Sequence, residues 1–305
     1  MINYFKKTLP LLLTALFIVS CGGDDDDYNV SPGSQSPSGN KTVNVNANPT
    51  TQHKEYGRLE VPRIKGTSDN LVLIHYTSQY GLNYMVEWDC IKKSQRWTCY
   101  TLDTRNSVKN VSRYYGDPQY PNDPDLPSMF RFTEDPYWGS GFDHGHICPS
   151  YDRLCSAEAN IQTFYMTNMQ PQYNKFNAGL WLNMENFVSN YFKNRNQNGT
   201  DTLYICKGGT IDNPSQLIMT TKKGMLVPKY FYMALLCKNS QGYKAMAFWV
   251  EQRNEDRSTD NLYNYVVSID RLEELTGIDF FCNLPDDTEE SIEKVVFPNS
   301  WGLKQ

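Results

Sequence analysis

The chain has 305 residues, of which 39% are hydrophobic and 21% are charged, and its formal net charge at pH 7 is −5. This composition can bury a sizeable core, and the length beyond the N-terminal segments suits one fairly large domain. The acidic balance excludes a protein that attracts polyanions through its overall charge, so contact with phosphates requires a local cluster of Lys and Arg side chains.

Residues 1–21 have the pattern of an export signal. Lys6 and Lys7 precede an apolar run from Leu9 to Val19, which is too short to cross a bilayer as a helix. The run ends in IVSCG, which resembles the processing site of bacterial lipoproteins, where the leader is cut before a cysteine that becomes acylated. We therefore expect lipid on Cys21. An ordinary secretory signal with a coincidental cysteine is the alternative.

Residues 22–57 are predicted to form a flexible tether. Four acids, Asp24 to Asp27, follow the cysteine. Such an acidic run is usually only solvated and disordered. Directly after a lipoprotein cysteine, it also resembles the signal that sends some Gram-negative lipoproteins to the cell surface. Residues 28–57 are rich in Ser, Pro, Asn, Gly and Thr and cannot offset the entropy of ordering, so His53 is expected to be inert. We expect an exported lipoprotein of the outer membrane, held at the cell surface by its lipid anchor.

Residues 58–305 are expected to form one α+β domain without internal repeats. Runs of β-branched and aromatic residues predict strands at 71–77, 83–89, 96–102, 202–206, 227–237 and 244–252. Helices are predicted after the cap Ser156, at 178–191, at 268–275 with Gly277 as C-cap, and from residue 288. Strands in blocks with scattered helices indicate a central antiparallel or mixed sheet with helices packed on it. His75, in the first strand, is expected to be a partly buried strand residue.

Seven cysteines follow Cys21 in the chain. An exported domain lies outside the reducing cytosol, so disulfides are expected, although an odd number leaves at least one thiol free or paired between chains. The connectivity does not follow from the sequence. An oxidising compartment favours a bond between the closely spaced Cys148 and Cys155.

The stretch 142–185 carries the residues best suited to catalysis. Two histidines follow Asp143, and two asparagines and a glutamate come later: His144, His146, Asn168, Asn177 and Glu185. An imidazole can take a proton from water near neutral pH, and amide and carboxylate oxygens are hard ligands that Mg²⁺ accepts. No plausible thiol or serine nucleophile accompanies them, so the set favours metal-assisted hydrolysis.

Three motifs occur here in a fixed order: DHGH at 143–146, NMQPQ at 168–172 and NAGLWLNME at 177–185. They closely resemble the Asp-Arg-Gly-His, Asn-x-x-Pro-Gln and Asn-x-Gly-x-Trp-x-x-x-Glu segments of the DNA/RNA non-specific endonucleases. Weaker resemblance extends from about Leu71 to Leu284. It implies the ββα-metal (His-Me finger) nuclease fold and a Mg²⁺-dependent endonuclease, with Mn²⁺ able to substitute, that cleaves DNA and RNA without sequence preference.

Carried over residue by residue, the resemblance gives each side chain a role. His146 is the general base that deprotonates the attacking water, and Asn177 holds the Mg²⁺. Because Glu185 lies about 12 Å of helix rise beyond Asn177, we expect it to hold a metal-bound water or orient a neighbour. Asn168 would position the base or the metal shell, and Asp143 would support the loop backbone.

His144 departs from the family, which has arginine at this position. Arginine supplies a fixed charge and a two-pronged donor for phosphate oxygens, whereas only a minority of an ordinary histidine is charged at neutral pH. We therefore expect a slower enzyme unless Arg153 or Lys175 reaches the phosphate from a neighbouring segment.

Two other interpretations stay open. The substitution at His144 allows a catalytically degenerate nuclease fold that is retained for binding. A surface binding lipoprotein could instead be stabilised by zinc on His144, His146, Cys148 and Cys155, although their spacing fits no common zinc pattern. Taken alone, Asn177 could be a helix cap and Asn168 a turn residue. The sequence determines neither the preference between DNA and RNA nor the oligomeric state.

Overall fold

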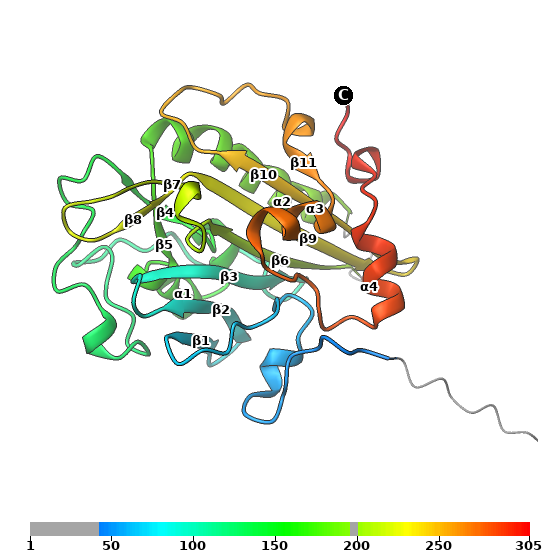
Figure 1. Cartoon of the computed structure of the whole chain (residues 1–305), viewed down its shortest axis with the longest axis horizontal. Coiled ribbons are helices and arrows are strands. Elements are labelled where there is room, and N and C mark those ends of the chain that lie inside the picture. The colour runs from blue at the N-terminus through cyan, green and yellow to red at the C-terminus, as the bar shows by residue number, and fades with distance from the viewer. Residues whose placement is uncertain (1–42, 196–200) are drawn as a thin grey trace, which may run out of the picture. The chain divides into compact units, whose positions relative to one another are not determined.

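The computed structural model describes residues 43–195 and 201–305 (Figure 1). The leader, Cys21, the acidic run and the first part of the predicted tether lie outside these residues. Within the described ranges, no helix combines the length and the apolar character needed to cross a membrane.

A seven-stranded antiparallel sheet forms the centre of the domain, with the strand order β1-β2-β3-β6-β9-β10-β11. Its strands are β1 Asn70–Thr77, β2 Gly81–Asp89, β3 Ser94–Leu102, β6 Thr202–Gly209, β9 Tyr230–Asn239, β10 Gly242–Glu251 and β11 Val266–Val267. All six strands predicted from sequence are present. The short edge strand β11 and β7 (Leu217–Thr220) were not predicted, because such short segments carry little periodic signal. The strand predicted at 227–237 is divided in the structure into β8 (Leu226–Pro228), which pairs with β7, and β9.

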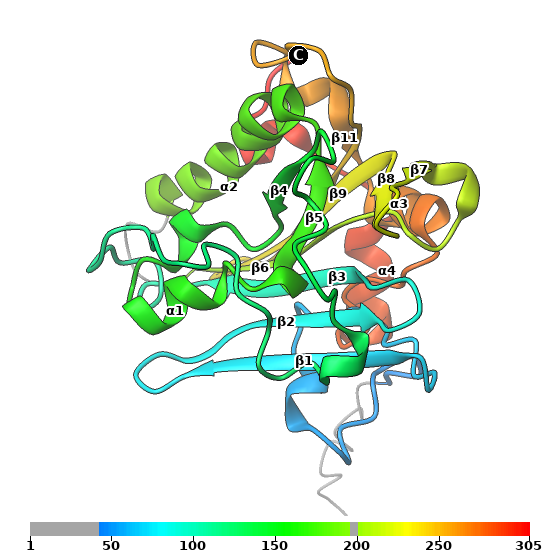
Figure 2. The same ribbon diagram turned by 90° about the vertical axis from the view of Figure 1, so that its left-hand side faces the viewer.

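Both faces of this sheet are buried. Along β9, Phe231, Met233 and Leu235 point into one core, while the alternating residues Tyr232, Ala234 and Leu236 point into another. The first core is covered by α2 (Leu182–Arg195) and the second by α3 (Ile269–Thr276), so these helices lie on opposite sides of the sheet (Figure 2). The expected α+β architecture is confirmed.

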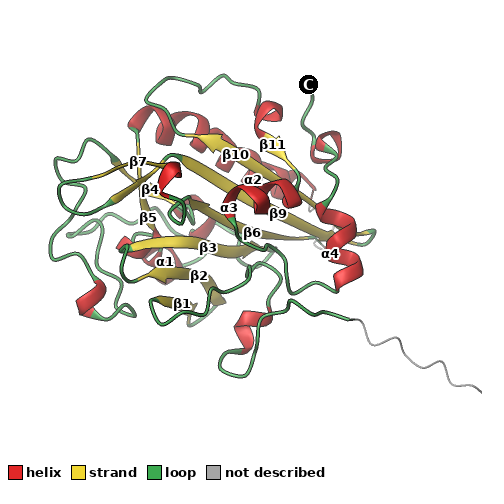
Figure 3. Ribbon diagram, viewed as in Figure 1, coloured by secondary structure: helices red, strands yellow, loops and turns green. Residues whose placement is uncertain are grey.

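Figure 3 shows where the helices, strands and loops lie along the chain. The helix boundaries follow local capping chemistry. The Ser156 side chain accepts a hydrogen bond from the Ala159 amide at 3.0 Å and starts α1 (Ala157–Gln162). Ser268 caps α3, which ends at Gly277 with φ of 67°, and α4 spans Asp286–Glu293. Short 3₁₀ helices occupy Lys54–Gly57, Ser128–Phe130, Ser150–Arg153, Met166–Asn168, Pro214–Gln216, Leu262–Tyr265 and Pro298–Trp301.

The catalytic motifs form a separate ββα unit. Strand β4 (Asp143–His146) pairs antiparallel with β5 (Met169–Gln172), and a π-helical segment at Phe176–Trp181 leads into α2. The predicted helix 178–191 therefore begins irregularly, with Gly179 outside helical geometry at φ −112° and ψ −105°. A Cβ atom at Gly145 would lie 2.4 Å from the Gln172 side chain, so any larger residue at this position of β4 would force the buried Gln172 side chain to move.

The predicted tether ends earlier than expected. Residues 43–57 do not extend freely from the domain but lie along the loop that joins α3 and α4. The Asn48 side chain is buried and donates to the carbonyl of Pro62 at 3.0 Å, and that of Asn44 donates to the carbonyl of Cys282 at 3.1 Å. The composition argument failed here because asparagine amides satisfy backbone groups of another segment without adding apolar surface.

The expected disulfides are not formed. No disulfide joins any two of the seven cysteines of the described residues, and all seven, including Cys148 and Cys155, are buried. Cys148 packs in the core between α2 and the sheet, and burial raises the pKa of its thiol to about 12. These cysteines therefore serve as small hydrophobic residues.

Candidate active site

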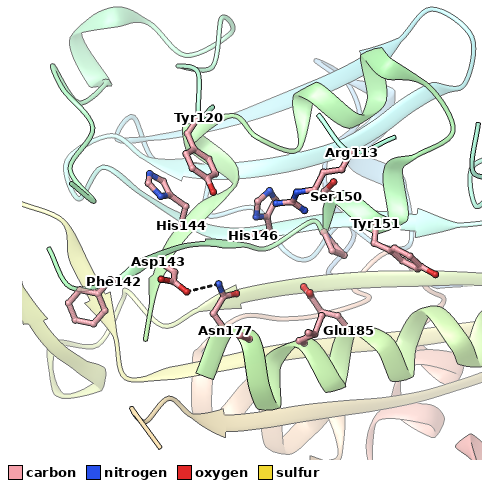
Figure 4. Close-up of a pocket in the computed structure, with 13 residues that line it drawn as sticks. Arg113, Tyr120, Phe142, Asp143, His144, His146, Ser150, Tyr151, Asn177 and Glu185 are labelled. Atoms are coloured by element: carbon pink, nitrogen blue, oxygen red, sulfur yellow. Dashed lines mark hydrogen bonds between the residues drawn. The ribbon is translucent and has the colours of Figure 1, made fainter. Parts of the chain in front are cut away.

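A pocket of about 440 Å³ opens beside β4, where the sequence motifs meet. Its walls come from β4, from the start of α2 and from the loop that carries Arg113 and Tyr120 (Figure 4). Five of the six residues predicted for catalysis and metal binding line it: Asp143, His144, His146, Asn177 and Glu185.

His146 has an unsatisfied nitrogen at this pocket. Its Nε2 atom is buried and has no hydrogen-bond partner, and its ring meets Phe164 edge-on with the centroids 4.8 Å apart. Burial of the ring and then the positive charge of Arg113 lower the pKa of His146 to about 3. The ring is therefore neutral at physiological pH and retains a lone pair that can accept a proton. A water or substrate atom is the expected partner of such an orphaned group.

Asn177 is oriented by Asp143. The Asp143 Oδ2 atom accepts hydrogen bonds from Nδ2 of Asn177 at 3.1 Å and from Nδ2 of Asn174 at 3.0 Å (Figure 4). Because the amide nitrogen of Asn177 faces Asp143, the amide oxygen is directed away from it and is available as a hard ligand. Asp143 thus holds side chains rather than the loop backbone that we expected it to support.

Glu185 lines the pocket as half of an ion pair. Its Oε1 atom lies 2.7 Å from Nζ of Lys207, a residue of β6 that is only 1% exposed and also lies over the Trp181 ring at 4.8 Å. Burial raises the pKa of Glu185, and the charge of Lys207 opposes that shift. The sequence analysis missed Lys207, although one charged residue in the apolar run TLYICKGG is a usable signal.

The backbone of β4 is held from two sides. Trp181, a core residue as expected, donates from Nε1 to the carbonyl of His146 at 3.3 Å. Asn168 is fully buried, and its amide bonds both the amide and the carbonyl of Cys148, at 2.9 and 2.8 Å. Asn168 does not line the pocket. It holds the backbone at Cys148, two residues after His146, where the chain leaves β4.

His144 makes no substitute for a phosphate-binding arginine. Its ring is stacked between Tyr120 and Tyr137, at centroid distances of 3.7 and 4.1 Å, and Nε2 lies 3.0 Å from Oδ2 of Asp135. Burial lowers the pKa of His144, and the nearby Asp135 opposes that shift. The ring is therefore mostly neutral at pH 7, and its edge is engaged by Asp135.

The structure contradicts one of the two expected replacements for the arginine, Arg153, while Lys175 stays a prediction. Arg153 is 1% exposed, and its guanidinium donates to the carbonyls of Asn83 and Thr101 at 3.0 and 2.9 Å. Lys175 is exposed but is not part of the pocket wall. Arg113 lies there instead, with its guanidinium 4.7 Å from the Phe164 ring. Arg113 was not predicted, because it lies in a long loop without regular structure, where no sequence pattern marks it.

The proposed zinc set does not assemble. In the described part of the chain, His144, His146, Cys148 and Cys155 do not form a cluster with metal-ligand spacing. A different group, His75 with Asp123 and Asp125, does lie close together. Each ring nitrogen of His75 faces its own carboxylate, Nε2 at 3.1 Å from Asp123 and Nδ1 at 3.4 Å from Asp125. Burial acts to lower the pKa of His75, but the two aspartates, of which Asp125 is exposed, outweigh it and raise the pKa.

Comparison with known proteins agrees with this geometry. A sequence model of the family described as DNA/RNA non-specific endonuclease matches residues 68–287. The chain is 31% identical to a nuclease of Nostoc sp. over 242 residues, which cover 76% of this chain and 81% of the relative. It is 29% identical to nuclease C1 of Cunninghamella echinulata var. echinulata over 212 residues, covering 68% and 83%. The crystal structure of an EndoG/EndoGI complex matches with a TM-score of 0.58 at 20% identity, over 70% of this chain and 88% of that chain, and shows a shared fold.

Proposed function

The chain belongs to the DNA/RNA non-specific endonuclease family and is a hydrolytic nuclease, and we propose that it cleaves both DNA and RNA without sequence preference in a Mg²⁺-dependent reaction. The observation that carries the proposal is the unpartnered Nε2 of His146, at a pocket that also contains an oriented amide and a carboxylate. A neutral imidazole, hard oxygen ligands and a cation are what phosphodiester hydrolysis requires.

The donor set at the pocket fits Mg²⁺. The amide oxygen of Asn177 would hold the ion, and Glu185 would hold one of its waters, in agreement with the preference of Mg²⁺ for few protein ligands and several waters. When bound, the ion would supply positive charge that neutralises the phosphate and stabilises the leaving oxygen. Mn²⁺, which also accepts oxygen ligands, is expected to substitute.

The residues of the chain divide the remaining work. His146 takes the proton of the attacking water, because its ring is neutral at physiological pH. Arg113 supplies the fixed positive charge for phosphate oxygens that His144 cannot provide from its stacked position. Asp143 and Lys207 act on other side chains, since the first orients Asn177 and the second stabilises ionised Glu185.

One assay tests this proposal directly. Purified protein should degrade plasmid DNA and a folded RNA at similar rates in millimolar Mg²⁺, and excess EDTA should abolish both activities. Restored activity on adding Mg²⁺ back distinguishes a metal requirement from denaturation. Cleavage that continues unchanged in EDTA would exclude the mechanism, and the absence of cleavage under all conditions would favour the degenerate binding fold.

We also propose that Cys21 is acylated and anchors the enzyme in the outer membrane, with the domain at the cell surface. The support is the sequence pattern alone: the leader, the IVSCG site and the acidic run from Asp24 to Asp27. Cys21→Ser should release soluble nuclease into the extracellular or periplasmic fraction. Unchanged membrane partitioning of that variant, together with protease resistance on intact cells, would contradict the anchor and the surface location.

A further inference from the structure

A cluster of acidic side chains lies on the sheet face opposite the nuclease pocket. Helices α3 and α4 cover this face (Figure 2), and they bring together carboxylate oxygens of Asp270, Glu273 and Glu293 within 4.8 Å of one another. Asp279 and Glu289 add further negative charge nearby. The nuclease reaction uses none of these residues.

No basic side chain neutralises this cluster. Among residues 43–195 and 201–305, no ion pair includes Asp270, Glu273 or Glu293. The cations on and next to the two helices form ion pairs with other acids, Arg271 with Glu274 at 2.6 Å and Lys294 with Glu290, although the charge of Lys294 also interacts with Asp270. A group of carboxylates without a counter-charge is unfavourable in a protein interior unless protons or a cation balance it.

Glu293 supplies a second, independent observation. Its side chain is 6% exposed, and its Oε1 atom is buried without any hydrogen-bond partner. One carboxylate oxygen of Glu293 lies within 4.8 Å of an oxygen of Asp270 and of Glu273, so this buried carboxyl with an unpartnered atom is part of the cluster itself. Buried polar atoms in native proteins are rarely left in this state, because an unmade hydrogen bond costs about 1–3 kcal/mol.

The electrostatics of the cluster agree with a missing cation. Burial, followed by the charge of Glu273 and Glu289, raises the pKa of Glu293 to about 10, and burial raises that of Glu273 to about 8. One backbone amide, that of Phe280 at 2.7 Å, is bonded to Glu273 and is too little to offset this effect. Without a cation, these acids would therefore hold protons at neutral pH.

We propose that Asp270, Glu273 and Glu293 bind one calcium ion that fastens α3 to α4. All three donors are carboxylate oxygens, which suit hard cations and not zinc or copper. Ca²⁺ takes oxygen ligands at about 2.3–2.6 Å, so two ligands of one ion lie at most about 5 Å apart, and the three oxygens here all lie within 4.8 Å of one another. The flexible coordination of Ca²⁺ also fits ligands from two helices better than the strict octahedron of Mg²⁺.

The site also lies next to the N-terminal segment. The Asn46 amide donates to Asp279 at 3.2 Å and to Glu289 at 3.0 Å, so the same acidic group that surrounds the calcium site holds residues 43–48. Calcium would thus stabilise both the helical cover of this face and the attachment of the segment that leads back toward the N-terminus. Its effect should appear in stability and not in the chemistry of the pocket.

Thermal unfolding of chelated full-length protein at pH 7.5 tests the site with CaCl₂ as the probe. Calcium at about a hundred times its Kd should raise the Tm by on the order of 5 °C. Glu293→Gln, which keeps the shape of the side chain, should abolish the rise. Glu274→Gln is the matched control, because Glu274 is exposed on α3 and pairs with Arg271, and it should keep the rise.

Direct binding separates this site from the pocket. In Asn177→Ala protein, which lacks the amide ligand of the pocket, equilibrium dialysis with ⁴⁵Ca²⁺ should still find one ion per chain. If Glu293→Gln does not fold, Asp270→Asn replaces it. The proposal is overturned if calcium leaves the Tm of the parent protein unchanged, if it stabilises the Gln or Asn variant equally, or if Asn177→Ala protein binds no calcium.

Discussion

The two faces of the central sheet stabilise buried carboxylates in different ways. On the pocket face, Glu185 lies 2.7 Å from Lys207, and Asp143 accepts hydrogen bonds from two asparagine amides. On the face covered by α3 and α4, Glu293 has an oxygen without any partner, and the charges that raise its pKa are those of other acids. A raised carboxyl pKa therefore does not by itself identify a catalytic group. The residues in contact with the carboxyl group show whether it belongs to an active site, as Glu185 does with Lys207, or needs a bound cation, as we propose for Glu293.

The largest expected effect on the pocket face comes from His146→Ala. Removing the base should lower kcat by about 10²–10⁴-fold while the fold is retained, since His146 lies at the pocket wall. Steady-state cleavage of plasmid DNA measures this loss, and His53→Ala, at an exposed position far along the chain from the motifs, is the control. A rate within a few-fold of the parent would remove His146 from the mechanism.

The pH dependence of the parent enzyme sharpens the same assignment. From sequence alone, activity should fall below about pH 6.5 as an ordinary imidazole is protonated. Because burial and Arg113 lower the pKa of His146 to about 3, the ring stays neutral well below pH 6.5, and the acid limb of kcat should lie below that value. A kcat profile with its midpoint at 6.5 would show that the ring titrates normally.

Lys207→Met tests the ion pair that distinguishes the pocket face. Removing one partner leaves the charge of Glu185 buried and unpaired, and breaking a buried pair typically costs about 3–5 kcal/mol. Urea unfolding should show a loss of this size, together with reduced cleavage. The double variant Lys207→Met with Glu185→Gln should recover part of the stability, because no unpaired charge remains, and equal loss in both variants would mean that Lys207 acts only by packing.

The sequence predicted the site best where motif and local structure coincide. The segments 143–146, 168–172 and 177–185 fall on β4, on β5 and on the entry to α2, and His146 and Asn177 line one pocket. The alternating apolar runs also located every long strand of the sheet. In both cases the signal lies within a few consecutive residues, which a linear pattern can report.

The partners of the site residues were not predictable in the same way. Lys207 reaches Glu185 from another strand, and Arg113 reaches the pocket from a loop whose course depends on tertiary packing. The orientation of His144 depends on Tyr120 and Tyr137, which are distant from each other in sequence. Contacts of this kind are set by the fold, and spacing along the chain carries no record of them.

On the opposite face, stability should fall as the pH rises. An acid whose folded pKa is raised keeps a proton that the unfolded chain releases, so its contribution is lost from about pH 4.5 upward. For Glu273 the window ends near its folded pKa of about 8, and for Glu289 near about 7. In EDTA, the Tm should therefore drop by a few degrees between pH 5 and pH 8, measured by circular dichroism.

Glu273→Gln should flatten this pH dependence, because the variant has no proton to lose at that position, and calcium should reduce the drop in the parent protein by favouring the ionised form. The ion triad at His75 acts in the same direction, since its raised pKa gives stability that is lost as the pH rises through that value. Subtracting the pH dependence of the Tm of Glu273→Gln from that of the parent protein removes the contribution of His75, which both proteins share. Identical slopes in the two proteins would place the titrating acids elsewhere.

The smallest effect is expected for His144→Arg, at the position where the chain departs from its family. The sequence argument predicted a kcat that is raised or unchanged, because arginine would restore a charge beside the phosphate. In the structure, Arg113 already places a cation at the pocket. His144 is stacked between Tyr120 and Tyr137, and its Nε2 atom faces Asp135. An arginine there would stack on the same tyrosines and pair with Asp135 in a bidentate manner. We therefore expect the kcat of His144→Arg to lie within about three-fold of that of the parent.

Arg113→Ala should lower kcat at least ten-fold, as expected for the loss of a charge-assisted contact worth about 1.5–3 kcal/mol. A large gain in kcat for His144→Arg, with little loss for Arg113→Ala, would show that the phosphate is bound from β4 and not from the loop.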